Sequence, residues 1–186
     1  MALTGRRLTL EEFLKLPEEK PALEYVDGVI VQKVAPQMFH GRMQSKLVER
    51  VNLYGEPSRL AMAFTETRST FGGRSYVPDV GIYRWDTLPR QPDGKLMRDS
   101  RTPWDVAIEV VSPDQRRADL EDKCRWYVAN GVEIALLVDP DREDIIRFGV
   151  DGSRVELRGA DRIDLDAVLP GFALTAAKLF ATLYPG

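Results

Sequence analysis

Hydrophobic and polar positions in the first third of the chain follow two different periods. Residues 22–34 form two β-rich runs joined at Asp27-Gly28, a pair typical of a hairpin turn. From Met38 to Tyr54 the apolar residues recur at helical spacing. Ahead of both, Thr9 to Glu12 has the pattern of a capping box and predicts a short helix. We therefore expect a helix, a hairpin and a longer helix in this order.

The middle of the chain predicts strands followed by a long polar segment. Residues 60–69 and 75–83 read as two strands around the turn Gly72-Gly73. Residues 84–103 are polar and rich in proline and glycine, so we expect an exposed loop. A loop of that length within a folded domain is commonly functional or mobile.

Continuous apolar runs dominate the second half of the chain. Residues 105–111 and 132–138 predict buried strands, and residues 118–130 predict a helix between them. A second hairpin over residues 145–158 follows, and Thr175 begins a terminal helix. This order of elements favours an α/β fold in which helices flank a mixed β-sheet.

Composition narrows the possible classes of function. The 186 residues, which we expect to form a single domain over 1–186, carry a net charge of −3. That charge is unlike a strongly basic DNA-binding domain, although a local basic patch can still bind phosphates. One cysteine and one histidine exclude a Cys/His zinc site and an internal disulfide, which fits a reducing cytoplasm. Neither a secretory signal nor an apolar run of about 18 residues is recognisable, so we expect a cytoplasmic protein without membrane spans.

Two acidic residues lie in runs that otherwise carry apolar side chains. Asp79 lies in YVPDVGIY, and Glu109 lies in DVAIEVV. A buried carboxylate is costly unless it is paired, and a metal ion is one possible partner. Strand alternation places Glu109 on one face with Ala107 and Val111. For Asp79, the alternative is a strand-end residue that caps backbone groups.

A lysine and a third acid extend this set. Lys123 lies three residues after Leu120 and four before Tyr127, so it points to the apolar side of its predicted helix. A lysine there either extends to water or meets an anion. Glu24, in the first hairpin, is a further candidate, with an exposed hairpin residue as its alternative reading.

Carboxylates with a lysine are suited to metal-assisted hydrolysis of phosphodiesters. Carboxylate oxygens bind the hard ion Mg²⁺, which keeps several waters. The ion lowers the pKa of a bound water, and the lysine can orient that water, deprotonate it or neutralise the phosphate.

Short motifs follow one another in a specific order along most of the chain. They are LTLEEFL (8–14), LEYVDG (23–28), His40, VPD (77–79), IEVVSP (108–113), DLEDK (119–123), YVANGV (127–132), VDP (138–140) and LPGF (169–172). Together they resemble the Uma-two family of restriction-endonuclease-like proteins, within the PD-(D/E)XK nuclease superfamily. The resemblance implies a restriction-endonuclease-like core and a metal-dependent endonuclease that hydrolyses DNA phosphodiester bonds.

The resemblance also implies roles for individual residues. Asp79 and Glu109 are the implied ligands of Mg²⁺ or Mn²⁺, Glu24 is an additional acidic site residue, and Lys123 is the catalytic lysine. The superfamily pattern places lysine two residues after the glutamate, where this chain has Val111. The resemblance implies that the following helix supplies the lysine instead, as Lys123. A symmetric pair of sites that cut two strands favours a homodimer.

Several residues and the long loop each have two possible interpretations. His40 and Ser112 are either site residues or a helix-start and a turn residue, and Cys124 is expected in the core. The loop over residues 84–103 is either a solvated surface or a basic rim that contacts phosphates. The chain could also be a nucleic-acid-binding or regulatory module without useful catalysis, or an interaction subunit whose carboxylates form structural ion pairs.

Overall fold

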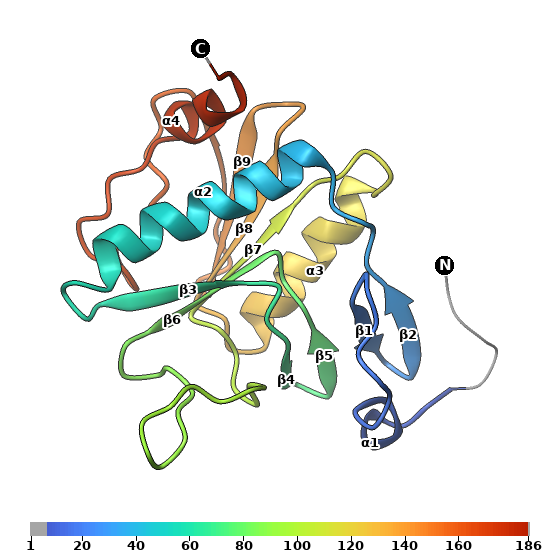
Figure 1. Cartoon of the computed structure of the whole chain (residues 1–186). Helices are drawn as coiled ribbons and strands as arrows, with labels where there is room; N and C mark the ends of the chain where they lie inside the picture. The colour runs from blue at the N-terminus through green and yellow to red at the C-terminus, as the bar shows by residue number, and fades with distance from the viewer. Residues whose placement is uncertain (1–6, 186) are drawn as a thin grey trace.

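The strands are divided between a six-stranded and a four-stranded sheet in the computed structural model, which describes residues 7–185 (Figure 1). The larger sheet has the order β10-β9-β8-β7-β6-β3; β7 and β8 are parallel, and the other neighbours are antiparallel. Its strands are β3 (Ala61–Thr65), β6 (Val80–Arg84), β7 (Val106–Val110), β8 (Ile134–Asp139), β9 (Asp144–Gly149) and β10 (Arg154–Arg158). The reading of the N-terminus as lacking a secretory signal rests partly on residues 1–6, which lie outside the described residues.

Helices cover both faces of the larger sheet, as the cyan and yellow ribbons of Figure 1 show. On one face, α2 (Met38–Gly55) packs against the side chains of Val106, Ile108 and Val110. On the other face, α3 (Arg117–Ala129) packs against Ala107. The predicted alternation along this strand is therefore confirmed, and so is the α/β fold with a mixed sheet between helices.

The smaller sheet contains the first hairpin. Its strands are β2 (Val29–Gln32), β1 (Leu23–Val26), β5 (Arg74–Tyr76) and β4 (Ser69–Phe71), in this spatial order. Asp27 and Gly28 both have positive φ, of 51° and 91°, the backbone conformation that a two-residue hairpin turn requires. The helix α1 (Leu10–Phe13) begins at the predicted capping box of Thr9 and Glu12.

The prediction of two strands over residues 60–69 and 75–83 was wrong, because each run is broken. Glu66, with φ of 46°, leaves the extended conformation and separates β3 from β4. Pro78 lies between β5 and β6, where it has no N–H to donate to a strand partner. As a result of these breaks, β3 and β6 belong to the large sheet, and β4 and β5 belong to the small one.

Arg84 is the last residue of β6, and the rest of the predicted loop, residues 85–103, contains no helix or extended strand within the described chain, although isolated bridges join Arg90 to Leu96 and Ser69 to Ser100. The C-terminal part consists of α4 (Ala176–Phe180), which Thr175 caps, and a short 3-10 turn, η1 (Ala181–Leu183). In the part of the chain that the structure describes, no helix is both long enough and apolar enough to cross a bilayer.

Candidate active site

Asp79 and Glu109 lie across from each other at the end of the β6–β7 pair. Val80 is paired with Ile108 in an antiparallel register, so the residue before Val80 stands opposite the residue after Ile108. Residues opposite each other in an antiparallel pair share a face. This is the face that α3 covers, because Ala107 belongs to the cluster of side chains under that helix. Both carboxylates are 2% exposed.

Both oxygens of Asp79 have polar partners. The backbone N–H of Val110 donates to Oδ2 at 2.7 Å, and Lys33 Nζ donates to Oδ1 at 2.6 Å. His40 Nε2 lies 3.2 Å from the same Oδ1. Burial opposes ionisation of Asp79, but Lys33 and His40 outweigh it and hold the pKa of this carboxyl well below its ordinary value.

Glu109 is held by two side chains of α3. The hydroxyl of Tyr127 donates to Oε1 at 2.7 Å, and Lys123 Nζ lies 2.9 Å from the same oxygen. Burial raises the pKa of Glu109, the charge of Asp79 adds to this effect, and Lys123 opposes it. The two opposed carboxylates thus have pKa values displaced in opposite directions.

Lys123 bridges Glu109 to the third acid, Glu24. Its Nζ donates to both oxygens of Glu24, at 2.8 and 3.1 Å, and lies 4.9 Å from the centre of the Tyr76 ring. Glu24 is fixed in turn by the backbone N–H of Val77, 2.9 Å from Oε1. Burial lowers the pKa of Lys123, but the two glutamates outweigh this and raise it above its ordinary value. The structure therefore brings together all four residues singled out in the sequence.

A second lysine, Lys33, belongs to the site although the sequence pattern does not single it out. It follows β2, and its side chain is 9% exposed. Besides Asp79, it donates to the carbonyl of Val77 at 2.8 Å. The hairpin register carried a usable signal: Glu24 pairs with Val31, so a residue two positions further lies on the same face as Glu24. We refer to Glu24, Asp79, Glu109, Lys33 and Lys123 as the acid–lysine cluster.

His40 and two neighbours hold the N-terminal end of α2 against this cluster. His40 Nδ1 lies 2.9 Å from Ser112 Oγ, and Gln44 donates to the backbone carbonyl of Asp79 at 3.3 Å. All three side chains are buried. His40 is thus next to Asp79, and Ser112 is next to His40. Cys124 is in the core as expected, where burial raises the pKa of its thiol.

A groove of about 640 Å³ connects the acid–lysine cluster to the surface. Glu24, Lys33 and Lys123 line it, between the β1–β2 hairpin and the beginning of α3. The other charged side chains that line it are of both signs: Arg74, Arg116, Asp114, Asp119 and Asp122. Of the described residues that line this groove, none belongs to the loop 84–103. The reading of that loop as a phosphate-contacting rim therefore has no support at this groove.

Comparison with known proteins gives the family. A sequence model of the Uma2 family, described as "Putative restriction endonuclease", matches residues 10–177. The chain belongs to the Uma2 family. A solved structure from Anabaena variabilis ATCC 29413, described as "a putative nuclease belonging to DUF820", superposes with a TM-score of 0.91. The two chains are 33% identical, over 95% of this chain and 99% of the other. A search of curated proteins found no match.

The donor atoms of this Uma2 protein suit a hard divalent cation. Among residues 7–185, no group of three or more His, Cys, Asp or Glu side chains is arranged to hold a metal ion. An ion on Asp79 and Glu109 would therefore complete its shell with water and substrate oxygens, as Mg²⁺ commonly does. In the described chain, His40 Nε2 is buried without a well-aligned hydrogen-bond partner. It lies 3.2 Å from Asp79 Oδ1, beside the oxygens that would hold the ion.

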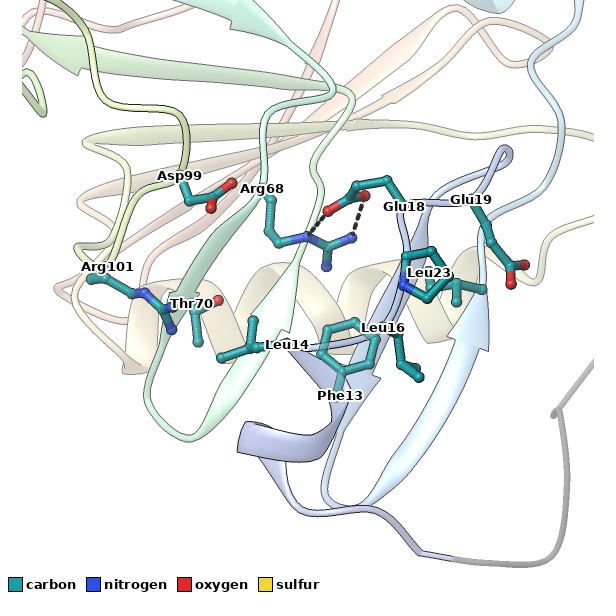
Figure 2. Close-up of a pocket in the computed structure, with 11 residues that line it drawn as sticks. Phe13, Leu14, Leu16, Glu18, Glu19, Leu23, Arg68, Thr70, Asp99 and Arg101 are labelled. Atoms are coloured by element: carbon teal, nitrogen blue, oxygen red, sulfur yellow. Dashed lines mark hydrogen bonds and ion pairs between the residues drawn. The ribbon is translucent and has the colours of Figure 1, made fainter.

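A second, smaller hollow of this Uma2 protein lies apart from the acid–lysine cluster. Figure 2 shows it between the segment after α1 and the strand β4, with the guanidinium of Arg68 turned toward the carboxylate of Glu18. Its volume is about 50 Å³, and Arg68 also stacks on the ring of Phe13 at 5.2 Å. These contacts fasten the N-terminal segment to the small sheet.

Proposed function

We propose that this protein is a nuclease that uses Mg²⁺ or Mn²⁺ to hydrolyse phosphodiester bonds of DNA. The observation that carries the proposal is the opposition of two buried carboxylates, Asp79 and Glu109, beside Lys123 and next to a groove. The descriptions of the family and of the solved relative support the nuclease part of this proposal.

In this proposal Asp79 and Glu109 hold the ion. When bound, the ion supplies a water of lowered pKa and stabilises negative charge that develops on the phosphate. The N–H of Val110 fixes the carboxylate of Asp79, and Tyr127 fixes that of Glu109. Both ligands are thus oriented before the substrate arrives, which is the arrangement that lowers the cost of reorganisation during the reaction.

Lys123 acts in this proposal as a cation rather than as a base. Its raised pKa keeps the ammonium charged at neutral pH, so it has no free lone pair to accept a proton from water. Glu24 holds this ammonium through both of its oxygens. Lys123 can therefore stabilise charge on a phosphate oxygen near Glu109, while Glu24 positions it.

The groove provides the path for the substrate backbone. Arg74 and Arg116 lie along it and can contact phosphates on either side of the scissile bond. The acidic residues near α3 offset part of this charge, so binding should depend on few phosphate contacts and respond moderately to salt.

A plasmid-nicking assay with Mg²⁺ tests the proposal. The wild-type protein should convert supercoiled plasmid to open-circular or linear product, and Glu109→Gln should lower the rate about 10²- to 10³-fold. Glu56→Gln removes an exposed carboxylate at the end of α2 and should cut like the wild type. Nicking that is independent of added metal, or unchanged in Glu109→Gln, would refute the proposal.

A second candidate function is nucleic-acid binding without cleavage. It is favoured by one observation: each carboxylate of the acid–lysine cluster is already within ion-pair distance of a lysine. Such a protein would retain DNA binding in a mobility-shift assay and show no nicking at any Mg²⁺ or Mn²⁺ concentration.

We also propose a homodimer, because cutting both strands of a duplex calls for two sites related by symmetry. Sedimentation equilibrium should give twice the mass of the 21.0 kDa chain. A monomer that still linearises plasmid in one binding event would rule out this part of the proposal.

A further inference from the structure

The position of Lys33 within the acid–lysine cluster goes beyond the roles given to the other members. Its Nζ is 2.6 Å from Asp79 Oδ1 and 2.8 Å from the carbonyl oxygen of Val77. The side chains of Lys33 and Asp79 are 9% and 3% exposed, so water screens this pair little. Lys33 thus places a full positive charge on the carboxylate that the proposed function assigns to the metal.

The other oxygen of Asp79 also has a donor. It accepts the N–H of Val110 at 2.7 Å, a bond that ties Asp79 to the backbone of β7. Lys33 lines the groove and Asp79 does not, so a cation that binds Oδ1 from the groove meets the ammonium of Lys33, 2.6 Å from that oxygen. Two cations that share one buried oxygen repel each other strongly because the local dielectric constant is low.

The chain around Lys33 permits the ammonium to leave. Lys33 follows the last residue of β2, and residues 33–37 run to the beginning of α2 without helix or strand. Lys33 also lines the groove, so its long side chain can turn from Asp79 toward solvent. The side chain of Lys33 can thus leave Asp79 without disturbing the strands that hold the carboxylates.

We infer that Lys33 is a built-in competitor of the divalent ion at Asp79 and sets the metal affinity of the site. This inference rests on the proposed function. In the molecules where Lys33 occupies Oδ1, the site does not accept the ion. The apparent dissociation constant is therefore the intrinsic constant divided by the fraction of molecules in which Lys33 has left Oδ1. Removal of the ammonium makes the carboxylate available in every molecule.

Calorimetric titration with Mn²⁺ on the full chain tests this inference without measuring activity. Lys33→Met should bind Mn²⁺ about tenfold more tightly than the wild type, or tighter still, because every molecule is then competent to bind. Lys33→Gln keeps a hydrogen-bond donor without the charge and should also bind more tightly, which covers the case in which the methionine variant folds poorly. Lys95→Met removes one exposed lysine of the loop 84–103 and should bind like the wild type.

The outcomes separate the inference from the proposed function. Binding of Mn²⁺ by the wild type that becomes tighter in both Lys33 variants is the expected result. Binding by the Lys33 variants alone would support the inference and refute the proposed function for the wild type. If the wild type binds Mn²⁺ and the Lys33 variants bind it equally or more weakly, the inference is overturned and the proposed function stands. If neither the wild type nor any Lys33 variant binds Mn²⁺, the proposed function fails and the inference fails with it.

Discussion

Buried carboxylates meet positive side chains of α3 in two regions of this molecule, and the two regions differ in the kind of cation. In the acid–lysine cluster the partner from α3 is Lys123, which contacts Glu24 and Glu109. In the second region, which we call the arginine network, Arg117 contacts Asp139 and Asp144. The carboxylates are equally hidden, with Asp144 1% and Glu109 2% exposed.

Further contacts hold the acids of the arginine network in place. Asp144 is also bound by Arg158 at 2.8 Å, and Asp139 accepts the backbone N–H groups of Asp141 and Arg142 in the turn after β8. Guanidinium groups stay charged and form planar, forked contacts with carboxylates. This network therefore locks the turn between β8 and β9 to α3.

The comparison teaches that burial of a carboxylate is not by itself the mark of an active site. Asp139 and Asp144 also stand opposite each other, across the β8–β9 pair. What distinguishes the acid–lysine cluster is that the pKa values of Asp79 and Glu109 are displaced in opposite directions, and that one of its acids, Glu24, lines a groove. Perturbed pairs of this kind are concentrated at functional sites.

The largest expected effect separates stability from function. Arg117→Met leaves two buried carboxylates without their shared partner, so the free energy of unfolding should fall by about 3–5 kcal/mol. Arg125→Met, on the exposed side of the same helix, should change it by less than about 0.5 kcal/mol. Urea unfolding measures both. If Arg117→Met is as stable as Arg125→Met, the arginine network does not have the structural role assigned here.

Next in size is the loss of the lysine of α3. Lys123→Met should reduce Mg²⁺-dependent nicking about 10²- to 10³-fold per folded molecule, because a cation next to the reacting phosphate is removed. The folded fraction is determined by circular dichroism. Arg117→Met, corrected in the same way, should retain nicking. Equal loss in both variants would mean that the two regions do not differ in function.

A third prediction concerns the stability of the protein at low pH. Asp79 has a depressed pKa in the folded protein, so it contributes stability above the pKa of the unfolded chain, about 3.9, and this contribution is lost as the pH falls. Asp79→Asn cannot take up that proton. The decrease in unfolding free energy between about pH 6 and about pH 3 should therefore be smaller in the variant by about 1 kcal/mol. Equal decreases would contradict the ion pair between Asp79 and Lys33.

The smallest expected effect concerns the rim of the groove. Arg116→Ala should weaken DNA binding and reduce the slope of log affinity against log salt by about 1, the signature of one lost phosphate contact. Arg142→Ala removes an exposed arginine beside the arginine network and should leave the slope unchanged. Fluorescence anisotropy at several salt concentrations gives both slopes. A loss of slope in Arg142→Ala alone would place the DNA on the other side of α3.

Much of the fold followed from periodicity. Residues 38–54 are helical because their apolar positions form one stripe, and residues 105–111 alternate between two cores because successive side chains of a strand face opposite ways. The division into two sheets was not predicted. It depends on the single residue Glu66 taking positive φ and on Pro78, whose effects on strand partners are decided by tertiary contacts.

The site was predictable where a polar residue interrupted an apolar run. Asp79, Glu109 and Lys123 gave that signal, and the structure places them together. Lys33 gave none on its own, because a lysine near the end of an exposed hairpin is ordinary; only the register with Glu24 shows its face. Asp144 was missed for a similar reason, since it begins a strand, where acids are common in turns.

A crystal soaked in Mn²⁺ and measured at a wavelength at which manganese scatters anomalously tests directly whether Asp79 and Glu109 hold the ion. We expect an anomalous peak within bonding distance of the carboxylate oxygens of Asp79 and Glu109, with the ammonium of Lys33 moved away from Oδ1. A site without such a peak at millimolar Mn²⁺ concentrations, in which Lys33 and Lys123 remain on the carboxylates, would contradict that expectation.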